Sequence, residues 1–163
     1  MKLYKHFSIA LISLSFMLGC GSSIDTAKLS KTKQLVDSRK FEIQNEWVIP
    51  MGGGRINLIG NPNFIRFKND SVNVFLPFFG ERFAGGGYNG EGAITYNGLL
   101  KDLEISSDER DTIIINFSTD QDTEDLDFTI TIYPEGKVNT RVNSSHRSFI
   151  SYQGEIGELK KND

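Results

Sequence analysis

The sequence predicts a mainly β fold, in which one N-terminal helix precedes about eight or nine antiparallel strands in a curved sheet or open barrel. After residue 40, apolar and polar residues alternate with period two, which is typical of strands with one buried face. The connections between these segments are short and polar, as hairpins require. No helix-length period separates the strands, so parallel βαβ units are excluded.

The first expected element is an amphipathic helix over residues 26–39, which contain no glycine or proline and follow Asp25 as a capping residue. The next is a strand over 41–50, in which Phe41, Ile43 and Trp47 alternate with polar residues and which ends at a proline. A glycine-rich turn follows it.

The later strands are read from the same alternation. Val72, Val74 and Leu76 share one face of a strand that ends before Pro77. Residues 80–98 contain seven glycines and predict a long loop with one short strand inside it. The segments with a strand pattern after residue 50 are 56–59, 64–68, 71–76, 93–96, 101–105, 113–117, 126–133, 138–142 and 149–152.

The N-terminus has the pattern of an export signal. Two lysines precede an apolar stretch over Phe7–Leu18 that is too short to span a bilayer. Gly19 and Cys20, the single cysteine of the chain, follow it directly. Leu18-Gly19-Cys20 is similar to a bacterial lipobox, in which the cysteine is acylated. The alternative is an ordinary signal peptide with a cysteine there by chance. We expect a cleaved lipoprotein signal peptide over 1–19, a tether over 20–25, one β-rich domain over 26–157 and a polar tail over 158–163.

Composition excludes several classes of protein. The net charge is −3, and it becomes −5 once the two lysines of the leader are removed, so the mature domain is a poor nucleic-acid binder. One cysteine rules out an internal disulfide. Of two histidines only His146 lies outside the leader, which excludes sites that need two imidazoles.

Two motifs carry a resemblance to a known family. Leu76-Pro77-Phe78-Phe79-Gly80 and Ile150-Ser151-Tyr152-Gln153-Gly154 are similar to the L-P-[YF]-F-G and I-S-Y-x-G motifs of Gram-negative envelope lipoproteins of the domain of unknown function 4251. Phe78 stands where tyrosine is expected, which removes one hydroxyl. The resemblance implies a compact β-rich domain in the cell envelope, at the periplasmic face or the outer-membrane surface, and it implies no activity.

An aromatic cluster in and beside the glycine-rich loop is the candidate ligand site. Rings offer flat faces, and glycines let the backbone approach a ligand closely. The alternative is that Phe78 and Phe79 plug the end of the sheet and that Arg82 is an ordinary solvated charge. The residues of this hypothetical site are Phe78, Phe79, Arg82, Phe83, Tyr88 and Tyr96.

The remaining polar clusters favour structural roles. The acidic run over residues 120–127 fails as a calcium loop, because its sixth position is Asp125 and its twelfth is Thr131, so we expect a charged hairpin tip. His146 lies in a polar segment that predicts a turn before the last strand. We therefore expect no metal, no cofactor and no catalytic residue.

Three tripeptides resemble the Asp-Ser/Thr-aliphatic acceptor for O-glycosylation of exported proteins. They place hypothetical glycans on Thr26, Ser71 and Thr112.

The sequence thus favours a non-catalytic ligand-binding or scaffolding module, attached to the membrane through acylated Cys20. The alternative is a protein-interaction subunit of an envelope assembly, and a carboxylate-dependent hydrolase ranks last. The expected partner is a small molecule or a protein, and not a nucleic acid.

Overall fold

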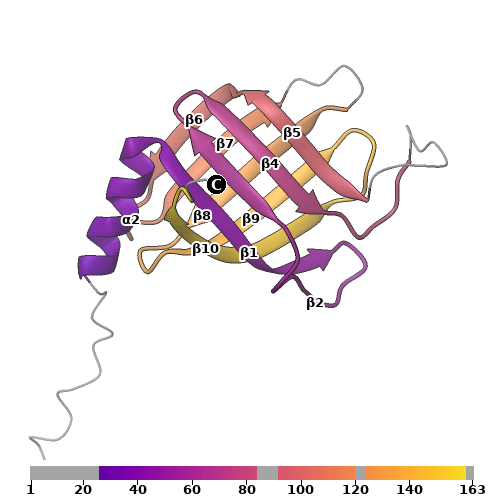
Figure 1. The fold of residues 1–163 in the computed structure, drawn as a ribbon, viewed down its shortest axis with the longest axis horizontal. Coiled ribbons are helices and arrows are strands. Elements are labelled where there is room, and N and C mark those ends of the chain that lie inside the picture. The colour runs from indigo at the N-terminus through magenta and orange to yellow at the C-terminus, as the bar shows by residue number, and fades with distance from the viewer. Residues whose placement is uncertain (1–25, 84–91, 120–123, 161–163) are drawn as a thin grey trace, which may run out of the picture.

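The computed structural model describes residues 26–83, 92–119 and 124–160. These ranges contain one helix and ten strands, and every strand pair is antiparallel. The sheet curls into a nearly closed barrel (Figure 1), which confirms the fold class expected from the alternation.

The order of the strands places the two ends of the domain at the centre of the sheet. Across the sheet the order is β5-β4-β3-β1-β10-β9-β8-β7-β6, and the short β2 pairs with β1 alone. The elements are α2 (Thr26–Ser38), β1 (Lys40–Pro50), β2 (Ile56–Asn57), β3 (Phe64–Lys68), β4 (Ser71–Pro77), β5 (Ala93–Leu99), β6 (Lys101–Ser107), β7 (Ile113–Thr119), β8 (Leu126–Ile132), β9 (Lys137–Ser144) and β10 (Ile150–Glu158).

Apolar side chains fill the interior of the barrel. Val72, Val74 and Leu76 are buried on one face of β4, as their alternation predicts. The rings of Phe117 and Phe128 stack with centroids 4.6 Å apart on adjacent strands. Burial of these alternating side chains is the main stabilising contribution to the fold, so the interior serves as its hydrophobic core.

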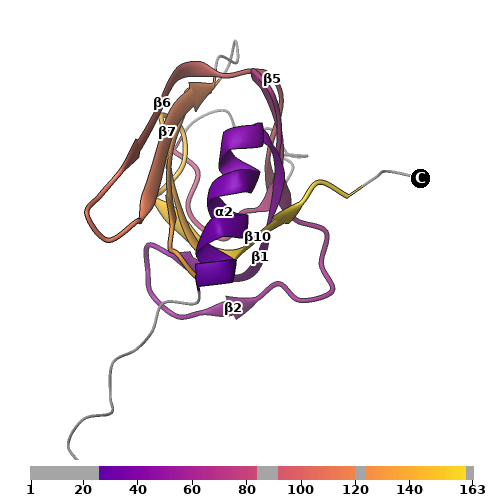
Figure 2. The ribbon, with the colours of Figure 1, turned by 90° about the vertical axis from the view of Figure 1, so that its left-hand side faces the viewer.

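Helix α2 lies across one end of the barrel, which we call the helical end (Figure 2). Val36 belongs to the core, and the Thr32 hydroxyl donates to the Pro134 carbonyl at 3.4 Å. Lys33 forms an ion pair with Asp111 at 2.7 Å. The helix ends at Ser38 because Arg39 has a φ of 51°, a left-handed conformation that often terminates helices.

A β-bulge in β1 changes which residues face inward. The register against β10 shifts between Asn45 and Trp47, so that Val48 becomes fully buried opposite Tyr152. Trp47 pairs instead with Gln153 on the outer face. The expectation that Trp47 shares a face with Phe41 and Ile43 is therefore wrong, because one extra residue reverses the phase of the alternation.

Gly154 permits this bulge. A Cβ atom there would lie 2.1 Å from the Gln44 carbonyl oxygen and 2.6 Å from the Asn45 Cα, both of which are backbone atoms. The glycine of the I-S-Y-x-G motif is thus required by close backbone contact between β10 and β1.

Candidate functional site

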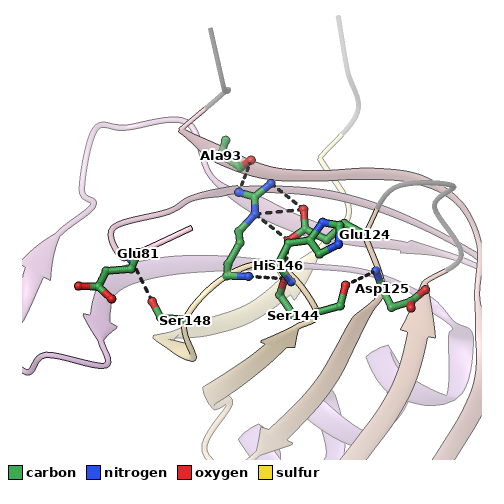
Figure 3. Close-up of polar contacts among 9 residues, drawn as sticks. Glu81, Ala93, Glu124, Asp125, Ser144, His146 and Ser148 are labelled. Atoms are coloured by element: carbon green, nitrogen blue, oxygen red, sulfur yellow. Dashed lines mark hydrogen bonds and ion pairs between the residues drawn. The ribbon is translucent and has the colours of Figure 1, made fainter. Parts of the chain in front are cut away.

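The end of the barrel opposite α2, which we call the loop end, brings the two family motifs together. Polar contacts around Glu124 and Ser144 lie at the same end (Figure 3). The Tyr152 hydroxyl donates to the Pro77 carbonyl at 2.9 Å. Burial raises the pKa of Tyr152, so its phenol stays protonated and remains a donor. A Cβ atom on Gly80 would meet the Ser148 hydroxyl and the Phe78 ring, so a larger residue there would require these side chains to shift.

A buried ion pair between Glu124 and Arg147 is the main polar feature of the loop end. Arg147 Nε donates to Glu124 Oε1 at 2.7 Å, and Nη2 donates to Oε2 at 2.9 Å. Both side chains are only 7% exposed. The Ser144 hydroxyl donates to the same carboxylate at 2.5 Å. This bidentate geometry is the strongest form of an arginine–carboxylate pair.

The environment of Glu124 keeps it ionised. Burial alone would raise its pKa, but the hydrogen bonds from Arg147 and Ser144 and the arginine charge outweigh that effect, so the pKa lies below its usual value. A carboxylate held in this state is a poor general acid at neutral pH.

Arg147 also connects the pair to the rest of the loop end. Its Nη1 donates to the Ala93 carbonyl at 3.0 Å, and its guanidinium lies 5.3 Å from the centroid of the Phe78 ring. The side chain therefore joins the connections that follow β4, β7 and β9. We interpret the pair as a structural link between these connections.

Two predictions about polar segments can be compared with this geometry. Glu124, in the expected charged hairpin tip, is not exposed to solvent, because its carboxylate is buried against Arg147. Residues 120–123 of that run lie outside the described residues. At His146, the structure shows the expected turn, in which the backbone amide donates to the Ser144 hydroxyl at 2.9 Å.

The aromatic residues of the hypothetical loop site have different environments. Phe78 packs against the core, whereas Phe79 and Phe83 are 39% and 67% exposed. Tyr96 is buried, and its hydroxyl donates to the Leu99 carbonyl at 2.6 Å, at the far end of β5 from the loop end. Arg82 forms an isolated bridge with Arg147. Tyr88 lies outside the described residues, so a ligand site in this loop stays a prediction.

A groove of about 290 Å³ lies elsewhere, on the outer face of β1, β10 and β9. Trp47, Gln153 and Asn139 form a row across these strands, because Trp47 pairs with Gln153 and Gln153 pairs with Asn139. Tyr133, which follows β8, lines the same groove and is 40% exposed.

Charged side chains complete the lining of the groove. Arg55 lies 4.6 Å from the centroid of the Trp47 ring and donates to Gln153 Oε1 at 2.9 Å. Lys137 is ion-paired with Glu155, whose hydrogen bond and charge raise the pKa of the lysine. Glu46 also lines the groove, and its charge is among those that raise the pKa of Lys137.

Sequence reasoning did not find this groove or the ion pair. The side chains involved come from separate strands and connections, and no local motif joins them. The one local signal for the groove is Gly154, whose place in a strand can indicate a bulge.

The three hypothetical glycosylation residues lie at or near the helical end. Thr26 is exposed at the start of α2, and the Ser71 hydroxyl donates to the Lys68 carbonyl at 2.9 Å. Thr112 is only 8% exposed. Of the three residues, Thr26 is exposed, Ser71 is half-buried and Thr112 is buried.

Among the described residues, no helix is long and apolar enough to cross a membrane, and no group of three or more metal-ligating side chains occurs. The fold and the site define a class of small antiparallel barrels with a core-filled interior, a helix across one end and a polar groove on the outside.

The chain belongs to the family described as Domain of unknown function (DUF4251), whose model matches residues 24–156. This finding confirms the resemblance carried by the two motifs. The fold is similar to the crystal structure of a DUF4251 family protein from Bacteroides eggerthii DSM 20697, with a TM-score of 0.66 and 18% identity over 85% of this chain and 92% of that chain. None of the curated proteins matches the chain.

Proposed function

We propose that the protein is a lipid-anchored cell-envelope module that binds a small polar ligand on its outer surface and catalyses no reaction. The groove on β1, β10 and β9 carries this proposal. Since apolar side chains fill the barrel, we place the ligand in an external groove that combines aromatic and polar groups.

The electrostatics of the described residues support a binding role over a catalytic one. Glu42 and Glu124 are the two buried acids of the described residues. Glu42 is ion-paired with Arg66 and Lys160, and Arg147 holds Glu124 as a carboxylate. A carboxylate-dependent hydrolase needs a second acid at a suitable separation, one of the two with a raised pKa. Glu124 is unsuited to the acid role because its pKa is lowered.

The anchor is proposed from the sequence around Cys20. We expect the Cys20→Ser variant to leave the membrane fraction and to lose the lipid mass, because the acylated thiol would be removed. Fractionation of cells, followed by intact-mass measurement of both forms, checks this. Ser22→Ala is the control, and a Cys20→Ser protein that stays membrane-bound would contradict the anchor.

The binding role can be tested on the native lipoprotein. We expect native mass spectrometry of the detergent-purified protein to show a bound small molecule, and the Tyr133→Ala variant to retain about tenfold less of it. The matched control is Phe149→Ala, since Phe149 is 38% exposed, close to the 40% of Tyr133, and does not line the groove. Equal retention in the two variants would count against the groove.

A protein-interaction role is the second candidate, favoured by β6. This strand pairs with β7 alone, and its edge is largely exposed, with Ile105 40% exposed. An exposed edge can accept a further strand from a partner. This role predicts that a second protein co-purifies in a stoichiometric amount. Replacing Glu104 by proline should abolish its binding, because proline disrupts the edge strand.

A further inference from the structure

We infer that the groove on β1, β10 and β9 binds a neutral saccharide through one of its sugar rings. This inference rests on the proposed function and names the class of ligand. The groove offers three features that suit such a ring. They are an aromatic face, hydrogen-bond donors and acceptors, and basic and acidic groups that balance each other once the partner of Lys137 is included.

The aromatic face comes from Tyr133 and Trp47. Tyr133 is 40% exposed at the edge of the groove, and Trp47 is partly buried within it. A sugar ring presents apolar C–H groups on its faces, which pack on the electron-rich face of an aromatic ring. Since Arg55 covers one face of Trp47, Tyr133 is the more available stacking partner.

The hydrogen-bonding groups come from two adjacent amides. Gln153 and Asn139 are cross-strand partners on the outer face. Each amide has an NH2 group that can donate to a sugar hydroxyl, whereas Gln153 Oε1 already accepts from Arg55 and Asn139 Oδ1 is buried. Glu46, which also lines the groove, supplies an acceptor. Both residues lie on paired strands, which hold their backbones in place. Binding therefore needs little loss of backbone freedom.

The charge of the groove favours a neutral ligand. Arg55 and Lys137 supply two positive charges, and Glu46 and the Glu155 that pairs with Lys137 supply two negative ones. An anionic ligand would lie beside Glu46 and would compete for Lys137 with Glu155, which lies outside the lining. A cationic ligand would meet two basic groups. A neutral ligand with many hydroxyls avoids both repulsions.

The size of the groove limits how much of a ligand it can hold. Its volume of about 290 Å³ is at the lower end of the range for small-molecule sites. We therefore expect it to hold one or two sugar rings, with any longer chain extending over the surface.

Trp47 provides a direct readout, because it is the only tryptophan of the chain. The full-length protein in detergent would be titrated with glucose, galactose, N-acetylglucosamine and maltose while tryptophan fluorescence is recorded. We expect at least one saccharide to change the emission with saturation. If the sugar stacks on Tyr133, Tyr133→Ala should lower the affinity for that saccharide about tenfold. Tyr133→Phe should keep most of the affinity, because it keeps the ring.

Two control variants assign the effect to the groove. Phe149→Ala removes a similarly exposed ring outside the groove and should leave the affinity unchanged. Phe83→Ala removes an exposed ring of the hypothetical loop site and should also leave it unchanged. Thermal unfolding of each variant shows that it is folded. A loss of affinity in Phe83→Ala with none in Tyr133→Ala would overturn the inference.

The ligand class and the binding role fail in different ways. No response to any of the four saccharides would overturn the inference. Inorganic phosphate, citrate and lysine are titrated in parallel as charged probes. If one of these changes the Trp47 emission and Tyr133→Ala abolishes the change, the saccharide class is wrong and the binding module stands. If the native protein also carries no small molecule that depends on Tyr133, the proposed function fails as well.

Discussion

Replacing Arg147 by methionine is expected to lower the free energy of unfolding by about 3–5 kcal/mol. The substitution leaves the carboxylate of Glu124 buried and without its bidentate partner. It also removes the hydrogen bond to the Ala93 carbonyl, which ties the start of β5 to the loop end. Chemical denaturation of the wild type and the variant measures the difference.

A second variant separates the cost of an unpaired charge from the loss of packing. The double variant Glu124→Leu/Arg147→Met removes both charges, so it should be more stable than Arg147→Met alone. The Arg39→Met variant is a surface control, because Arg39 pairs with an exposed Asp70 and should change stability by less than about 1 kcal/mol. An Arg147→Met protein as stable as this control would contradict our interpretation of the pair.

Replacing Gly154 by alanine is expected to cost about 3 kcal/mol. The added Cβ would lie 2.1 Å from the Gln44 carbonyl oxygen, and a backbone atom in a paired strand cannot move away without disturbing the ladder. We also expect the emission of Trp47 to change, because the bulge that sets the position of Trp47 lies directly opposite Gly154. Thermal unfolding and tryptophan fluorescence report the two effects.

Gly157→Ala is the matched control for this substitution. Gly157 lies in the same strand and pairs with Glu42 in the same ladder, but nothing lies within 4 Å of its would-be Cβ. Its replacement should change stability by no more than about 0.5 kcal/mol. Equal effects at the two glycines would show that close backbone contact is not the reason for Gly154.

The strands could be predicted because each one carries its own signal. The alternation of Val72, Val74 and Leu76 depends only on one face being buried, and the structure buries all three. The same is true of α2, whose end at Ser38 is within one residue of the expected end at residue 39. The spacing of apolar residues along each segment shows which face is buried, and this burial stabilises the element.

The site could not be predicted because it depends on register and on distant pairs. Trp47 follows the alternation of β1 in the sequence, yet the bulge moves it to the outer face, where it lines the groove. A single extra residue in a strand leaves no trace in composition. Similarly, Glu124 and Arg147 come from different connections, and each looks like an ordinary surface charge when it is considered alone.

The position of α2 also has a consequence for how the molecule would be oriented. The helix begins at Thr26, six residues after Cys20. Six residues reach at most about 20 Å when fully extended. With Cys20 acylated as we propose, this short tether holds the helical end close to the lipid headgroups. The loop end then points away from the bilayer, and the groove, on the flank of the barrel, is open to solutes that diffuse parallel to the membrane.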